Sequence, residues 1–213
     1  MSIRQSAVRR ERAREHTRRD ILLCAAGVFA RRGYAAATLQ ELADAAGFAA
    51  PSLYRYFESK EEIFRSLVEL VVGELEATFA APVDRTQPLA ARLEGLFLAQ
   101  AGIGEAFRPA VDLLQQAGPD LPGMQELCTP RGGRAYYEAR LLAWLERNAD
   151  RSELRHPPEL VARALAGIGF AFRGDGEEPR PTGAERVRLV VDLAFNGIAA
   201  PARVPERKPN GRP

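Results

Sequence analysis

Apolar residues from residue 17 onward recur at intervals of three and four, which is the spacing of one face of an α-helix rather than of a strand. The run Thr17–Asp20 has the pattern of a capping box, and the apolar stripe that follows it ends at Gly33. Similar boxes at Thr38–Glu41 and Ser59–Glu62 open two more apolar stripes, with a stop at Gly47 between them. The pattern predicts an all-α protein.

Residues 38–57 predict two short helices joined by a tight turn at Gly47, which is a helix-turn-helix when a third helix braces the pair. Pro51 suits the first turn of the second helix. Leu53 and Phe57 give that helix an inward apolar face. The second helix of such a pair enters the major groove of DNA. Its exposed face carries short or flat groups, namely Ala50, Pro51, Ser52, Tyr54, Arg55 and Tyr56.

The positive charge of the chain gathers at one end. Residues 1–60 hold 11 Lys and Arg against six Asp and Glu, whereas residues 61–213 hold 19 against 22. A basic head on a mildly acidic body is typical of a nucleic-acid-binding domain joined to a domain with another task. Seven arginines lie among the first twenty residues. They favour contact with a DNA groove or with phosphates, which would weaken steeply with salt, and a solubilising tail is the alternative.

Turn-forming residues and composition divide the whole sequence into segments. Residues 1–16 are expected to form a basic flexible arm, residues 17–60 the helix-turn-helix domain, residues 61–199 a helical domain and residues 200–213 a disordered tail. After a long helix from Ser59, helices are expected at about 88–101, 105–117, 131–149, 158–173 and 182–199. The stretch 119–130 leaves room for one short helical turn.

Residues 17–64 resemble the N-terminal domain of the TetR family of bacterial transcriptional regulators. The resemblance is carried by Ile21, Leu22, Ala25, Ala26, Phe29, Gly33, Tyr34, Thr38, Leu42, Ala43, Ala46, Gly47 and the run Ser52–Glu62. The string that begins at Leu53 and ends at Lys60, after a glycine turn, is far more specific than a lone helix-turn-helix pattern. The close match covers about a quarter of the chain.

The resemblance implies roles for individual DNA-binding residues. Thr38 caps the first helix of the pair and donates to a phosphate, Gln40 lies where a base edge comes within reach, and Lys60 binds a phosphate. Tyr54 and Tyr56 contact phosphates or a base.

The leading face of the recognition helix is formed by Ala50, Pro51 and Ser52. Position 50 often carries a polar or basic side chain in the family, and a methyl group can only pack against a thymine methyl or simply fit. Base readout is therefore expected to depend more on Gln40, Ser52, Arg55 and the N-terminal arm.

For the C-terminal helices the resemblance implies a ligand-binding and dimerisation domain. The last two helices look too apolar to leave a face exposed to solvent. This favours pairing with a second copy of the chain, and packing within one chain is the alternative. Dimerisation is expected at Leu165, Ile168, Phe172, Val187, Val191, Ala194, Phe195 and Ile198. A small, largely apolar ligand is expected at Phe97, Phe107, Leu114, Met124, Tyr137, Leu141, Trp144 and Phe170, although aromatic stripes at helical spacing more often form a core.

These expectations combine into a homodimeric repressor that binds a palindromic double-stranded DNA operator and is released by an unidentified small-molecule effector. A small helical enzyme is one alternative, but no catalytic constellation, phosphate loop or metal cluster is visible, and no cofactor is expected. A nucleic-acid-binding protein without sequence preference is another, and it predicts a basic surface throughout. The two cysteines, and the lack of an apolar run long enough to span a bilayer, favour a cytoplasmic protein without a membrane partner.

Overall fold

The computed structural model describes residues 2–111, 132–171 and 183–196. Helices account for all the regular secondary structure in these ranges, as the apolar spacing predicted. Their bounds are α1 Ser2–Arg32, α2 Leu39–Ala45, α3 Ala50–Leu53, α4 Lys60–Ala80, α5 Leu89–Ala106, α7 Gly132–Asn148, the 3₁₀ helix η1 Arg151–Glu153, α8 Pro158–Ala171 and α9 Gly183–Asn196. The stretch 119–130 and the expected tail at 200–213 lie outside the described residues.

Helix α1 begins far earlier than the sequence pattern indicated. It runs without a break from Ser2 to Arg32, so the expected helix start at Thr17 and the expected flexible arm over residues 1–16 are wrong. The Thr17 hydroxyl does not cap a helix but donates to the carbonyl of Ala13, four residues earlier, at 2.9 Å. The segment is rich in Ala, Arg and Glu, which favour helix, and it has no Gly or Pro to interrupt one.

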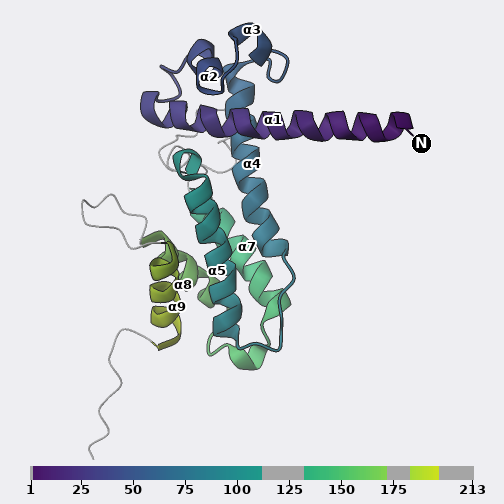
Figure 1. The fold of residues 1–213 in the computed structure, drawn as a ribbon. Coiled ribbons are helices and arrows are strands. Elements are labelled where there is room, and N and C mark those ends of the chain that lie inside the picture. The colour runs from purple at the N-terminus through teal and green to yellow at the C-terminus, as the bar shows by residue number, and fades with distance from the viewer. Residues whose placement is uncertain (1, 112–131, 172–182, 197–213) are drawn as a thin grey trace, which may run out of the picture.

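The head of the molecule consists of the second half of α1, the two short helices α2 and α3, and the first turns of α4 (Figure 1). Its core is built around side chains that are almost completely buried, among them Ile21, Phe29, Leu42, Phe57 and Phe64. Gly33 and Gly47, which end α1 and α2, have φ angles of 76° and 75°. Both therefore occupy the left-handed region expected of a glycine stop.

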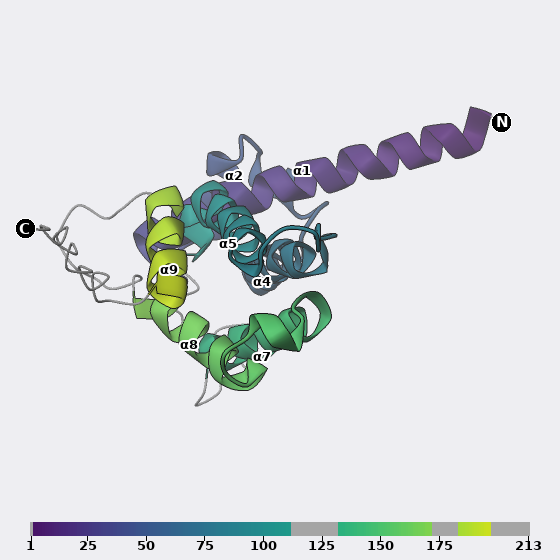
Figure 2. The ribbon, with the colours of Figure 1, turned by 90° about the horizontal axis from the view of Figure 1, so that it is seen from below.

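The body consists of the rest of α4 with α5, α7, α8 and α9 (Figures 1 and 2). In it α9 packs on α5 and α8 packs on α7 around a core that includes Trp144, Leu141 and Leu93. Helix α5 continues through the break expected after residue 101 and ends at Ala106.

Helix α4 joins the two cores. Ile63 and Leu67 lie in the head core, whereas Phe79 lies in the body core. The boundary expected after Lys60 thus falls at the start of a helix that both cores share. None of the helices that the structure describes combines the length and apolar character needed to cross a membrane.

Candidate nucleic-acid interface

The start of α2 is fixed by the capping box that the sequence predicted. The Thr38 hydroxyl accepts from the backbone N–H of Glu41 at 3.2 Å, and the Glu41 carboxylate accepts from the backbone N–H of Thr38 at 3.0 Å. Arg32 at the end of α1 donates to the same carboxylate at 2.6 Å. Arg32 and the Thr38 groups together lower the pKa of Glu41, so this carboxylate, which ties α1 to α2, stays ionised to a lower pH than an ordinary glutamate.

Helix α3, the predicted recognition helix, is a single turn, with Pro51 in its first turn as predicted. Leu53 is buried and ends the helix, and the chain continues through a turn to the buried Phe57. Phe48 lies beside Tyr56, with ring centroids 5.7 Å apart, so it closes the gap between the turn and the segment after α3. The helical extent expected for residues 54–57 is therefore shorter in the structure.

The predicted DNA-binding residues of this region differ in how much they face solvent. Tyr54 is 56% exposed, the highest value among the large apolar side chains of the described residues, and Arg55 and Pro51 are exposed beside it. Ala50 and Ser52 are half-buried. Tyr54 and Arg55 are thus the side chains best placed to reach a ligand outside the protein.

Two further predicted residues make contacts within the protein. Gln40 on α2 is exposed, and its amide donates to the carboxylate of Asp44 at 2.7 Å. Tyr56 is half-buried against Phe48, and its backbone carbonyl accepts from the guanidinium of Arg18. Tyr56 therefore helps to hold the segment in place, and its ring offers less surface to a partner than that of Tyr54.

Lys60 has a different environment from the one expected of a phosphate-binding lysine. Its ammonium donates to the backbone carbonyls of Tyr34, Ala35 and Ala37 at 3.0, 3.2 and 3.0 Å. It also lies 4.8 Å from the ring centroid of Tyr34. Because an ammonium has three hydrogens, these bonds use its whole donor capacity. In this structure Lys60 fastens the α1–α2 loop to the start of α4.

Tyr34 completes this junction. Its hydroxyl donates to the carboxylate of Glu61 at 3.1 Å, and its ring packs against Phe29 and Phe64. Burial, followed by the neighbouring Glu61 carboxylate, raises the pKa of Tyr34 to about 12. The hydroxyl therefore keeps its proton, and with it the hydrogen bond to α4, to a higher pH than an ordinary tyrosine would.

Two arginines of α1 that sequence reasoning assigned to DNA are half-buried and make contacts within the protein. The guanidinium of Arg18 lies 4.1 Å from the ring centroid of Phe57 and pairs with Glu62 at 3.4 Å. Arg19 pairs with Glu74 of α4 at 2.6 Å and lies 5.2 Å from the ring of Phe107. The partners of the first ion pair are 44 positions apart in the sequence, and those of the second are 55 positions apart. No local sequence pattern therefore predicts these contacts.

Comparison with known proteins decides which family this head belongs to. A sequence profile described as "Bacterial regulatory proteins, tetR family" matches residues 21–67, which contain the end of α1, both short helices and the start of α4. Residues 21–67 of the chain thus match the DNA-binding domain of the TetR family. The proteins that this profile and the matched relatives describe are transcriptional regulators.

Relatives and solved structures agree with this assignment. The chain is 42% identical over 82 residues to the transcriptional repressor KstR2 of Mycobacterium tuberculosis, and 35% identical over 88 residues to the transcriptional activator FasR of Mycolicibacterium smegmatis. These matches span 38% and 39% of this chain and only 41% and 40% of the two relatives. The crystal structure of the TetR-family regulator PfmR from Thermus thermophilus is 25% identical, with a TM-score of 0.62, over 84% of this chain and 99% of that chain.

The residues expected to form the dimer interface separate into two groups. Leu165 and Val187 are buried in the body core of their own chain, with Ile168 and Val191 packed against it. Leu165 and Val187 thus have the intrachain packing that was the alternative to dimerisation, whereas Ile168 and Val191 remain partly exposed. Ala194 and Phe195 are exposed, together with Leu160 and Leu189, which were not among the expected residues. Phe172 and Ile198 lie outside the described residues.

The residues expected to bind a ligand are only partly brought together. Phe97, Leu141 and Trp144 lie in the body core with Tyr137 beside them. Phe107 lies in the head core instead, because α5 continues to Ala106 and carries it up to α1. Leu114 and Met124 are outside the described residues, as is the side chain of Phe170.

Sequence reasoning missed two linked side-chain hydrogen bonds that connect α7, α5 and α4 in the body. The hydroxyl of Tyr137 on α7 donates to the side-chain carbonyl of Gln100 on α5 at 2.6 Å. The amide nitrogen of Gln100 in turn donates to the hydroxyl of Thr78 on α4 at 3.2 Å. A pocket of about 260 Å³ is lined by Thr78, Trp144 and residues of α5 and the α4–α5 loop. The indole N–H of Trp144 is buried and makes no hydrogen bond within the described part of the chain.

Proposed function

We propose that this protein is a transcriptional repressor that binds a palindromic double-stranded DNA operator as a homodimer in the bacterial cytoplasm. The observation that carries the proposal is the head itself, in which a capped α2 and a glycine turn hold Tyr54 and Arg55 exposed beside α3. The matched relatives include both a named repressor and a named activator. The repressor assignment follows the relative of higher identity.

DNA contact is assigned to the side chains that face solvent at the end of the head. Tyr54 and Arg55 are proposed to contact phosphates or base edges, with Pro51, Ser52 and Ala50 against the groove floor. Thr38 and Gln40 are proposed to reach DNA from α2, and Gln40 must then leave its bond to Asp44. Tyr56 and Lys60 act mainly by positioning the segment that carries Tyr54.

Two copies are required because one short recognition helix reads only a few base pairs. Helix α3 is a single turn, which makes the requirement stronger. The exposed apolar residues Leu160, Leu189 and Phe195 on α8 and α9 supply a surface for pairing with a second copy.

An effector that prefers one arrangement of the two heads would shift the dimer away from its operator-bound state. The body core around Trp144 and Phe97 suits a largely apolar molecule. The linked hydrogen bonds of Tyr137, Gln100 and Thr78 provide polar groups with which a polar atom of that molecule would bond. Trp144 is the only tryptophan of the chain, so its fluorescence reports directly on binding at this place.

The proposal is tested by selecting DNA from a random pool with the full chain and footprinting the selected sequence. A protected palindrome is expected. The Tyr54→Ala variant should fold normally and bind the selected duplex about tenfold or more weakly, which corresponds to about 1.4 kcal/mol. Recovery of unrelated sequences with no protected palindrome would favour a nucleic-acid-binding protein without sequence preference. Unchanged affinity of Tyr54→Ala would contradict the site.

A further inference from the structure

The N-terminal half of α1 projects from the molecule as a free-standing helix. Residues 5–16, named here the N-terminal extension, are all exposed, whereas the buried positions of α1 begin at Ile21. Figures 1 and 2 show the extension leaving the head on the side opposite α9. Because the extension and the head core share one unbroken helix, its direction relative to α3 is fixed.

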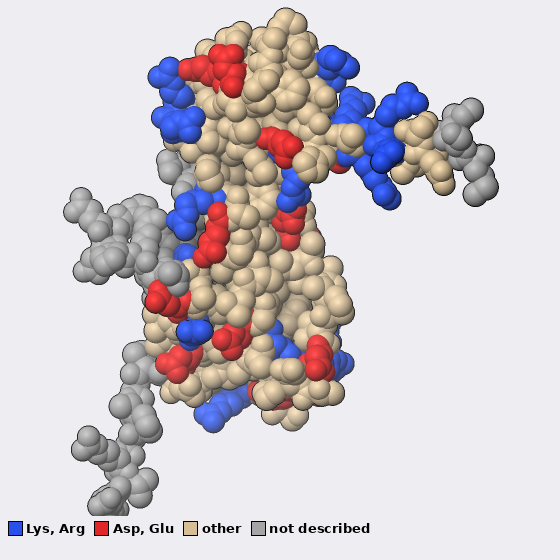
Figure 3. Space-filling view, in the orientation of Figure 1, with Lys and Arg blue, Asp and Glu red and all other residues tan. Residues whose placement is uncertain are grey.

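The charges of the extension are sorted by side. Arg9, Arg10, Arg12 and Arg14 cover roughly one half of the helix circumference at 3.6 residues per turn. Glu11 and Glu15, four residues apart, share a stripe on the opposite half. Figure 3 shows Lys and Arg side chains gathered on this projection.

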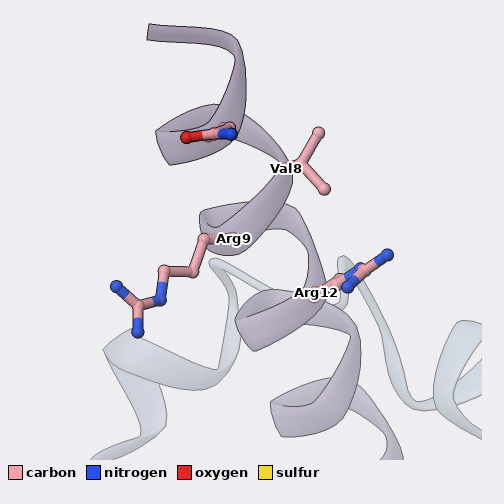
Figure 4. Close-up of a pocket in the computed structure, with 4 residues that line it drawn as sticks. Val8, Arg9 and Arg12 are labelled. Atoms are coloured by element: carbon pink, nitrogen blue, oxygen red, sulfur yellow. The ribbon is translucent and has the colours of Figure 1, made fainter. Parts of the chain in front are cut away.

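The extension has no apolar stripe with which to dock on another protein. Val8 is its one large apolar side chain and is 52% exposed. Gln5, Val8, Arg9 and Arg12 line a shallow hollow on the extension. Figure 4 shows the side chains of Val8, Arg9 and Arg12 projecting outward from the helix. Exposed guanidinium groups on a helix that also carries a DNA-binding head are suited to phosphate oxygens.

We propose that the N-terminal extension binds the phosphate backbone of DNA that flanks the operator, on the side away from the dimer partner. This inference rests on the proposed DNA-binding function. The pairing surface on α8 and α9 lies opposite the extension, so the two extensions of a dimer point outward along the DNA. The contact adds affinity without adding base readout, because phosphate contacts carry no sequence information.

The length of the extension sets the length of DNA it reaches. Twelve helical residues span roughly 18 Å, which equals about five base pairs of B-form DNA. Protection beyond the palindrome is therefore expected to extend by up to about five base pairs on each side.

The test compares two duplexes that carry the selected palindrome, one with ten flanking base pairs on each side and one without flanks. The double variant Arg9→Gln, Arg12→Gln should bind the flanked duplex about tenfold more weakly and the short duplex like the unmodified protein. Its affinity for the flanked duplex should also depend less on salt, since each lost phosphate contact lowers the slope by about 0.9. The matched control is Arg85→Gln, Arg155→Gln, which removes the same charge from exposed positions at the far end of the body.

The outcomes are distinct. Equal binding of both duplexes by the double variant and the unmodified protein would overturn the proposal. An equal loss on both duplexes would also overturn it, since the arginines would then act within the palindrome. Selection of no DNA by the unmodified protein would instead refute the proposed function itself.

Discussion

At the scale of single residues, the same side chains that match a DNA-binding pattern divide into those that face outward and those that hold the head together. Tyr54 and Arg55 face solvent, whereas Lys60 uses its hydrogens on three loop carbonyls. A sequence match assigns a role to a position, but only the packing around that position shows whether its donors are free.

Replacing Lys60 by Met should therefore lower the stability of the protein. The three carbonyls lose a charged donor, and the free energy of unfolding should fall by about 1–3 kcal/mol. Urea denaturation measures the change. Arg55→Ala is the control, because an exposed substitution should alter stability by less than about 0.5 kcal/mol while weakening DNA binding. A Lys60→Met protein of unchanged stability but weaker DNA binding would restore Lys60 as a direct phosphate contact.

At the scale of elements, the head depends on where each helix stops. Gly47 ends α2 in a left-handed conformation, and the position of α3 relative to α2 follows from that turn. A glycine inside a helix, unlike Gly47, has a conformation that any L-residue can adopt. Gly73 of α4 has helical neighbours and open space around the place of a Cβ.

Gly47→Ala should destabilise the protein by about 1–2 kcal/mol, because an L-residue resists the left-handed region. Gly73→Ala should instead stabilise it by about 0.5–1 kcal/mol, since alanine loses less backbone entropy in a helix. Thermal unfolding of the two variants side by side measures both signs. If Gly47→Ala also raised the melting temperature, the turn geometry described for α2 and α3 would be wrong.

At the scale of the whole molecule, α4 carries the head and the body as one connected structure, and α8 and α9 leave apolar side chains at the surface. Because Leu165 and Val187 are buried within the chain, pairing through α8 and α9 would have to use the outer residues of these helices.

Phe195→Glu together with Leu189→Glu should convert the proposed dimer to a monomer, because each charge would be buried against an apolar partner surface. Analytical ultracentrifugation at micromolar concentration measures the change, and operator binding should fall with it. Leu98→Glu on α5 is a matched control, since Leu98 is 41% exposed and Phe195 is 42% exposed. A dimer that survives the double substitution would place the interface elsewhere.

The sequence alone determined the helical class, the capping box at Thr38, the glycine stops and the inward-facing Leu53 and Phe57 of the head. These features depend on neighbours within a few positions, or on one repeating apolar period. It also indicated which residues are candidates for DNA contact.

The tertiary structure decided which candidates are free. Arg18, Arg19 and Lys60 find their partners more than 20 positions away, on elements that meet only after folding. The same long-range packing carries Phe107 into the head and keeps Leu165 inside the body. Local patterns predict what a segment can become, whereas the choice between an internal and an external contact is made by distant surfaces that compete for the same side chain.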